Sequence, residues 1–184
     1  MDIVGMLGGK TVHPISALPG GMSKAINEEE RAQIEAWGHD LVEFGLFGLQ
    51  LFKDVVLGND EYKELILSDA FTTPMYYMGL VDENNHVNFY DGKVRVVDPE
   101  CNEFVKYAPD QYLDVVSEHV EPWTYLKFPF LKEVGWKGFT TGMDSGVYQA
   151  TPLSRLNAAD GMATPKAQEA YEEFYETLGG KPVH

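Results

Sequence analysis

The apolar residues of this chain recur with two different periods, and the period changes near residue 76. Between residues 27 and 57 they return every three or four positions, which is the pattern of a helix with one buried face. Between residues 76 and 107 they approach alternation, which indicates β-strands with one covered face. Because a small sheet needs helices to cover that face, we predict an α+β fold. It has a long amphipathic helix and shorter helices packed on a small antiparallel β-meander.

The helix expected at residues 27–57 has clear signals at both ends. Asn27 caps its first turn, Glu30 completes a capping box, and Gly58 follows as the stop. Glycines within this segment lower its helix propensity, so contacts with other elements must hold the helix. The stripe that we predict to be buried consists of Ile34, Trp37, Leu41, Phe44, Gly48, Leu51, Phe52 and Val55.

Shorter elements are expected in the rest of the chain. Strands are predicted at residues 76–81, 87–90, 93–97 and 103–107, and further helices at residues 60–70, 109–119 and 165–178. Lys93 and Arg95 are expected to point outward from their strand. The aromatic segment 120–132 is predicted to form an extended, buried strap. No internal repeat or low-complexity linker divides the chain, so we predict one α+β unit over residues 1–184.

Charge and composition exclude several classes of protein. The net charge of −15, from 29 acidic and 14 basic residues, would repel a nucleic-acid backbone. No run of about 18 uncharged apolar residues appears, so no membrane span is expected. The start of the sequence also lacks the features of a signal peptide. A single cysteine, Cys101, rules out an internal disulfide and fits a reducing, cytoplasmic setting.

The usual motifs of catalytic and nucleotide sites are missing from this sequence. It contains no Gly-x-Gly-x-x-Gly after a strand, no Gly-rich loop ending in Lys-Ser/Thr, and no Gly-x-Ser-x-Gly. Glu118, His119 and Glu121 are metal ligands by residue type. Their crowding at one predicted helix end gives poor convergence, so we predict neither a metal site nor a catalytic residue.

Two residues stand out as candidates for supporting a site. Arg155 lies among Pro152, Leu153 and Leu156, and a guanidinium in apolar surroundings needs partners. The simplest interpretation is a structural arginine that binds loop carbonyls or a carboxylate. His13 precedes a proline and is interpreted as a fixed hydrogen-bonding group, with a proton relay as the alternative.

Three segments, in order along the chain, resemble a known family. They are Gly-Gly-Lys-Thr-Val-His-Pro with Pro-Gly-Gly at residues 8–21, Glu-His-Val-Glu-Pro-Trp-Thr-Tyr-Leu-Lys-Phe-Pro at residues 118–129, and Tyr-x-x-x-Pro-Leu-Ser-Arg-Leu-Asn at residues 148–157. They are similar to segments of the large subunit of NiFe hydrogenases. The F420-non-reducing (methyl-viologen-reducing) and NAD-reducing types are the most similar in character.

The resemblance implies that residues 1–184 are the central part of a longer hydrogenase large subunit, with both Cys-x-x-Cys ends absent. It implies a Ni–Fe centre for the full-length protein, no cofactor in this chain, and an inactive isolated chain. The implied partners are an iron–sulfur small subunit and further electron-transfer subunits. His13 and Arg155 would support the metal pocket or an intersubunit contact. Thr151 and Gln149 depart from the family pattern, where Gly and Arg are expected.

Two other functions remain open from the sequence. The first is a non-catalytic binding or scaffolding module derived from a hydrogenase large subunit, which the absence of all four metal-binding cysteines would explain. The second is an unrelated enzyme that uses His119 and nearby acids. If the chain is a fragment, apolar side chains should be exposed where the missing parts pack.

Overall fold

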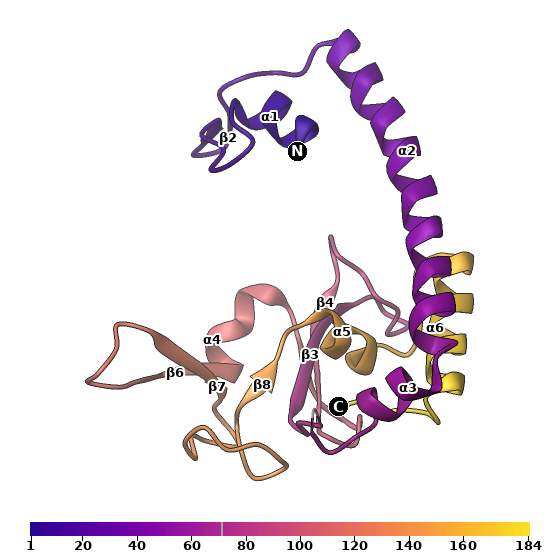
Figure 1. The fold of residues 1–184 in the computed structure, drawn as a ribbon. Helices are drawn as coiled ribbons and strands as arrows, with labels where there is room; N and C mark the ends of the chain where they lie inside the picture. Colours follow the sequence, from indigo (N-terminus) through magenta and orange to yellow (C-terminus); the bar gives the residue numbers. More distant parts are fainter. Residues whose placement is uncertain (71) are drawn as a thin grey trace. The chain divides into compact units, whose positions relative to one another are not determined.

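The computed structural model describes residues 1–70 and 72–184 (Figure 1). The chain divides into two compact units, Met1–Asp54 and Val55–His184. The α+β fold is confirmed, because a long helix and several shorter helices accompany small antiparallel and mixed sheets. The single unit over residues 1–184 remains a prediction. No helix in the described part of the chain is long and apolar enough to cross a membrane.

The first unit begins with a short helix, which is followed by a two-stranded antiparallel sheet. Helix α1 (Asp2–Gly8) ends at Gly9, which adopts the left-handed conformation with φ 73°. Strands β1 (Ala17–Leu18) and β2 (Gly21–Met22) then pair with each other.

The long helix α2 (Glu28–Phe52) starts at the predicted residue. The Asn27 side chain accepts a hydrogen bond from the Glu30 backbone at 2.8 Å, and Glu30 accepts from the Asn27 backbone at 3.2 Å. A π-helical turn, η1 (Lys53–Leu57), continues the helix.

The buried stripe predicted along this helix is wrong, because no residue of α2 is buried. Its apolar side chains include Phe44, which is 68% exposed. Periodicity identifies a face that another surface can cover, but it does not show that this chain supplies that surface.

A four-stranded sheet lies at the centre of the second unit (Figure 1). Strands β3 (Tyr76–Val81), β4 (Lys93–Val97) and β5 (Glu103–Tyr107) form the predicted antiparallel meander. Strand β8 (Tyr148–Gln149) joins β3 in parallel and gives the order β5-β4-β3-β8. The strand predicted at residues 87–90 is absent from this sheet.

The segment 87–90 is instead a connection between β3 and β4. Val87 forms only an isolated bridge with Val81, and the chain then turns until β4 begins. Asn88 explains the turn, because its side chain accepts hydrogen bonds from the backbones of Tyr90 and Asp91 at 2.9 and 3.3 Å. Such local bonds compete with strand pairing.

Both faces of the sheet are covered within the second unit. On one face Tyr76, Val96 and Leu131 belong to one apolar cluster. On the other face Tyr77 and Val97 pack with Ala158 of helix α5 (Pro152–Ala158). A sheet covered on both faces buries alternate residues on each side, so either face of a strand can become core.

Two helices of the second unit begin where they were predicted, but the first ends at Ile66, short of the predicted residue 70. Helix α3 (Asp60–Ile66) is capped by the side chain of Asn59, which accepts a hydrogen bond from the Glu61 backbone at 3.0 Å. Helix α6 (Pro165–Thr177) starts after Thr164 and buries Tyr171 and Tyr175.

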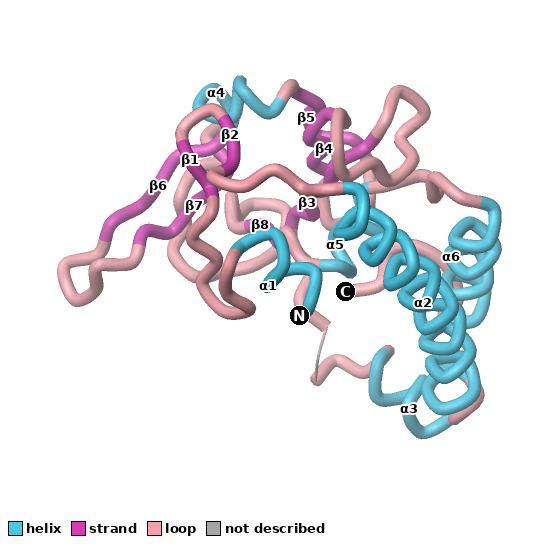
Figure 2. The backbone as a smooth tube through the Cα atoms, turned by 90° about the horizontal axis from the view of Figure 1, so that it is seen from above, coloured by secondary structure: helices cyan, strands magenta, loops and turns pink. Residues whose placement is uncertain are grey.

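The helix predicted at residues 109–119 is correct only in its first half. A 3₁₀ turn, η2 (Pro109–Gln111), and helix α4 (Tyr112–Val115) are followed by strand β6 (Val116–Val120). Strand β6 pairs with β7 (Lys127–Leu131) in a hairpin that projects from the sheet (Figures 1 and 2). Cross-strand pairing of β-branched and aromatic residues therefore overrides the helical spacing from residue 116 onward.

The strap predicted at residues 120–132 is extended where β7 forms, but most of it is not buried. Trp123 is 67% exposed and Tyr125 is 94% exposed, whereas Leu131 is fully buried. Both exposed residues lie in the turn of the hairpin, which extends away from the helices and strands described for this unit (Figure 2).

Candidate functional site

Helix α5 is built by local signals that the sequence contains. Thr151 caps it, with its hydroxyl accepting from the Ser154 backbone at 3.3 Å, and Pro152 occupies the first turn. The Ser154 hydroxyl returns a hydrogen bond to the Thr151 carbonyl at 2.7 Å. These bonds fix the start of the helix and thereby the position of Arg155.

Buried hydrogen bonds hold the other end of α5. Asn157 is fully buried, and its amide donates to the Val183 carbonyl at 2.7 Å. Its carbonyl oxygen accepts from the Tyr175 hydroxyl at 2.8 Å. Burial raises the pKa of Tyr175, which keeps this phenol protonated as a donor. Helix α5 is thus a rigid platform for Arg155.

Gly79 of β3 lets this helix approach the sheet closely. A Cβ atom at Gly79 would lie 3.2 Å from both the Arg155 Cα and the Ala158 Cβ atoms. A larger residue at this position would push α5 away from β3.

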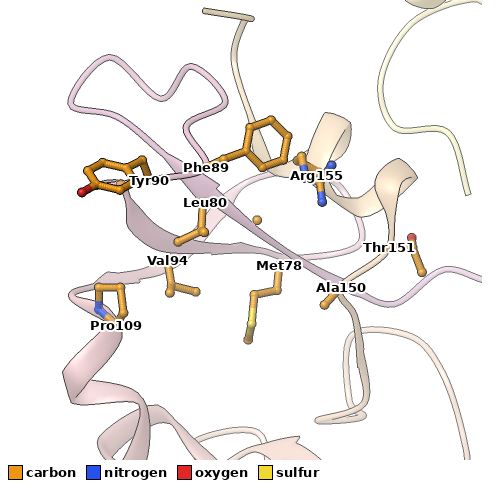
Figure 3. A pocket seen from close by; sticks show the side chains of 11 residues that line it. Met78, Leu80, Phe89, Tyr90, Val94, Pro109, Ala150, Thr151 and Arg155 are labelled. Atoms are coloured by element: carbon orange, nitrogen blue, oxygen red, sulfur yellow. The ribbon is translucent and has the colours of Figure 1, made fainter. Parts of the chain in front are cut away.

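A pocket of about 540 Å³ lies beside Arg155 (Figure 3). Strand β8 pairs with β3 only at Tyr76 and Tyr77, after which the chain turns into α5. The pocket occupies the space between this turn and the connection from β3 to β4. Its lining residues are Met78, Gly79, Leu80, Phe89, Tyr90, Gly92, Val94, Pro109, Ala150, Thr151 and Arg155.

Arg155 contacts an aromatic ring. The Cζ atom of its guanidinium lies 4.4 Å from the centroid of the Phe89 ring, a cation–π contact. Within residues 1–70 and 72–184 the structure shows no ion pair for Arg155. The described residues therefore provide neither the loop carbonyl nor the carboxylate that the interpretation as a structural arginine requires.

The second arginine of this unit, Arg95, has the opposite environment. Its side chain is only 8% exposed and forms ion pairs with Glu103 at 2.8 Å and Asp160 at 3.0 Å. It also donates to the Ala158 carbonyl at 2.9 Å. The prediction that Arg95 points outward is wrong, because α5 covers that face of β4. The sequence did contain one signal of this environment, because an arginine in a central strand whose two faces are both covered needs internal partners.

His13 lies in the first unit, in the loop after α1. It is exposed and adopts a positive φ of 53°. The loop passes so close to Gly8 that a larger residue would not fit there, because a Cβ atom at Gly8 would lie 2.3 Å from the Pro14 Cβ atom. The roles assigned to His13 and Arg155 from the resemblance remain predictions.

In the β6–β7 hairpin, His119 and the acidic side chains each contact one polar partner. His119 Nε2 lies 2.8 Å from a Glu121 oxygen, and the imidazole stacks on Trp136 at 4.4 Å between ring centroids. Glu118 pairs with Lys127 at 3.0 Å across the hairpin. Among the described residues, no group of three or more His, Cys, Asp and Glu side chains is arranged to hold a metal ion.

Cys101 lies in the turn between β4 and β5. Burial raises the pKa of this thiol to about 11, so it is protonated at neutral pH. Since the thiolate is the form that binds metals and attacks electrophiles, Cys101 is a poor ligand and a poor nucleophile in this fold.

Comparison with known proteins links the chain to hydrogenases, although no family model matches it. It is 43% identical over 184 residues to an F420-non-reducing hydrogenase iron–sulfur subunit of Archaeoglobus profundus, covering 100% of this chain and 38% of that protein. It is 30% identical over 187 residues to the NAD-reducing hydrogenase HoxS subunit beta of Cupriavidus necator, covering 98% of this chain and 36% of that protein. The chain therefore spans well under half the length of these relatives.

A solved structure also resembles this chain. A crystal structure of an NAD⁺-reducing NiFe hydrogenase in the H2-reduced state matches with a TM-score of 0.71 and 26% sequence identity. The match covers 91% of this chain and 35% of that one.

The name of the Archaeoglobus relative corrects the kind of hydrogenase subunit that was assigned from the sequence. That relative is an iron–sulfur subunit, so the prediction of a nickel-dependent large subunit is wrong. The Ni–Fe centre as the implied cofactor and the iron–sulfur small subunit as a partner are wrong with it. The alternative of a scaffolding module derived from a large subunit fits no better. The physical reason is that the three resembling segments contain no cysteine, so they cannot distinguish one kind of metal subunit from another.

The residues of this chain do not fit an iron–sulfur cluster. Such clusters are held by several cysteine thiolates. The chain has one cysteine, and burial raises the pKa of its thiol. We therefore assign no electron-transfer step to a cluster held by these residues.

Proposed function

We propose that this chain is a segment of a hydrogenase subunit and that it functions within an oxidoreductase assembly with other hydrogenase subunits. The proposed subunit corresponds to the Archaeoglobus relative among the F420-non-reducing hydrogenases. The observation that carries the proposal is the 43% identity over the full 184 residues of this chain. Because the match extends across both compact units, it is not the product of one common motif.

The structure supports a positioning role for this segment in the assembly. Helix α5 is fixed at both ends by hydrogen bonds, and it presents Arg155 at an open pocket. The described residues hold no metal-ligand cluster, so the redox centres of the assembly would be held by other residues. This segment would then shape the protein around those centres and contact neighbouring subunits.

We also infer a cytoplasmic location for the assembly. The single cysteine fits a reducing compartment, and no helix of the described part could span a membrane. Fractionation of the native cells tests this inference, with the chain expected in the fraction that contains cytoplasmic marker enzymes.

Affinity capture from native cells tests the hydrogenase proposal. An antibody raised against this chain should recover other hydrogenase subunits, which mass spectrometry identifies, and H2-dependent reduction of benzyl viologen in the same eluate. A matched antibody against an unrelated cytoplasmic protein serves as the control. Capture of the chain without hydrogenase subunits and without this activity would contradict the proposal.

A further inference from the structure

We propose that the pocket beside Arg155 binds a carboxylate next to an apolar side chain, both presented by a partner polypeptide. The chemistry of this pocket does not depend on the hydrogenase proposal. The identity of the partner as another hydrogenase subunit does rest on it.

The guanidinium of Arg155 is the charged group that selects the carboxylate. The chain has three arginines and an excess of acidic residues. Arg31 pairs with Glu28 and Glu35 at 3.0 Å each, and Arg95 pairs with two carboxylates. Arg155 pairs with none within the described residues. An arginine left without a carboxylate in so acidic a chain marks a position that an external acid can fill.

The contact with Phe89 prepares Arg155 for this role. The ring packs against the guanidinium at 4.4 Å and restricts its movement. A ring placed over the guanidinium leaves the N–H groups around its edge open to an acceptor. A carboxylate can meet two of these N–H groups at once, so the preferred ligand is a carboxylate rather than a neutral acceptor.

The rest of the pocket favours an apolar group. Met78, Leu80 and Val94 lie on the face of the sheet opposite to α5, and the pocket reaches them around the edge of β3 that β8 leaves free (Figure 3). Among the described residues that line the pocket, Arg155 alone carries a charge. A volume of about 540 Å³ lies within the range of small-ligand pockets and accommodates a large apolar side chain. The arrangement therefore suits one carboxylate and one apolar group, and a second charge on the ligand would have no partner.

The rim indicates a polypeptide as the source of these groups. Tyr90 is 98% exposed and Phe89 is 68% exposed, both in the connection from β3 to β4. Exposed aromatic residues around an apolar pocket are typical of protein interfaces. The partner segment is thus an aspartate, a glutamate or a C-terminal carboxylate beside a leucine-like or aromatic residue.

Photo-crosslinking in the native assembly tests this proposal. Tyr90 is replaced by p-benzoylphenylalanine in the full-length subunit, and the assembly is irradiated and digested. Mass spectrometry should find position 90 joined to a peptide of another chain that carries a carboxylate beside an apolar residue. Crosslinks only to water-exposed segments without a carboxylate, or no crosslink to another chain, would overturn the proposal.

Charge variants test the role of Arg155 in that crosslink. R155M should lower the crosslink yield about tenfold or more, because the partner carboxylate loses its counter-charge. K166M, at an exposed position of α6 that does not line the pocket, removes the same charge and should leave the yield unchanged. An unchanged yield in R155M would overturn the proposal.

A charge reversal keeps the test independent of any folding defect. R155D should abolish the crosslink, and replacement of the identified partner acid by arginine should restore it in the same background. Failure of this rescue, when both variants assemble, would contradict a direct pair.

The two proposals fail in distinguishable ways. A crosslink from position 90 to a protein that is not a hydrogenase subunit would support the pocket and refute the hydrogenase partner. An assembly with H2-dependent viologen reduction but no crosslink from position 90 would retain the hydrogenase proposal and refute the pocket.

Discussion

The surroundings of Arg95 and of Arg155 show how one type of side chain serves two purposes in this protein. Arg95 is 8% exposed and binds two carboxylates and a carbonyl of its own chain. Arg155 stacks on an exposed phenylalanine beside an open pocket and has no carboxylate among the described residues. A charge whose partners are internal stabilises the fold, whereas a charge without internal partners is available to another molecule.

The largest expected effect that separates the two regions is on stability. Arg95→Met removes three hydrogen bonds of a buried guanidinium, to the Ala158 carbonyl and to the carboxylates of Glu103 and Asp160, and it should lower the free energy of unfolding by about 3 kcal/mol. Arg155→Met should change it by about 0.5 kcal/mol or less, because no internal ion pair is lost. Guanidinium chloride titration of both variants measures the difference. Equal losses would show that Arg155 is also a structural residue.

A second prediction concerns the contact between β3 and α5, which positions Arg155. Gly79→Val should destabilise the protein by about 2 kcal/mol, because the new side chain meets Arg155 and Ala158 at close range. Gly21→Val, at a glycine with open space around it, is the matched control and should change stability by about 0.5 kcal/mol or less. If thermal unfolding shows the same shift for both variants, the close approach of α5 to β3 is not a constraint.

The pH dependence of stability tests the Arg95 region more finely. Burial by itself would raise the pKa of Asp160, but hydrogen bonds from Asn85 and Arg95 outweigh it, and the pKa lies below the usual value. A group with a lowered native pKa contributes stability above its unfolded pKa, and this contribution is lost as the pH falls through the native pKa. Stability should therefore decrease below about pH 4.

Asp160→Asn removes this titration and identifies its source. The variant should lose stability at neutral pH and show a shallower decrease in acid than the parent protein. Asp110→Asn, an exposed carboxyl in η2, is the control for the loss of one negative charge. Denaturant titrations at a series of pH values measure both. An unchanged acid slope in Asp160→Asn would refute the role of this carboxyl.

The smallest expected effect is the coupling between Arg155 and Phe89. Their contact at 4.4 Å should contribute about 0.5 kcal/mol, as is usual for an exposed cation–π pair. A double-mutant cycle with Arg155→Met and Phe89→Leu isolates this coupling from other effects of each substitution. A coupling of zero would mean that Phe89 does not orient the guanidinium.

Much of the fold was predictable because its signals are local. The capping box at Asn27 and Glu30, the proline at the start of α6 and the alternation in β4 each act within a few residues. The misplaced elements depend on partners outside their own segments. Strand β6 forms because the next strand, β7, turns back and pairs with it, which the spacing within residues 109–119 does not reveal. Arg95 points inward because α5, far along the chain, covers its face of the sheet.

The candidate site was only partly predictable. Arg155 could be chosen from the sequence because of its apolar neighbours. The pocket, however, depends on where β8 stops pairing with β3 and on the connection that contains Phe89. The family resemblance led to hydrogenases but to the wrong subunit, because the resembling segments carry none of the cysteines by which metal subunits differ.

A structure of the intact native assembly tests the central comparison most directly. We predict that a carboxylate from another chain lies within hydrogen-bonding distance of the Arg155 guanidinium, with an apolar side chain against Met78, Leu80 and Val94. The carboxylates at Arg95 should still be Glu103 and Asp160 of the same chain. A guanidinium of Arg155 that faces only solvent, or that pairs with an acid of its own chain, would contradict the account.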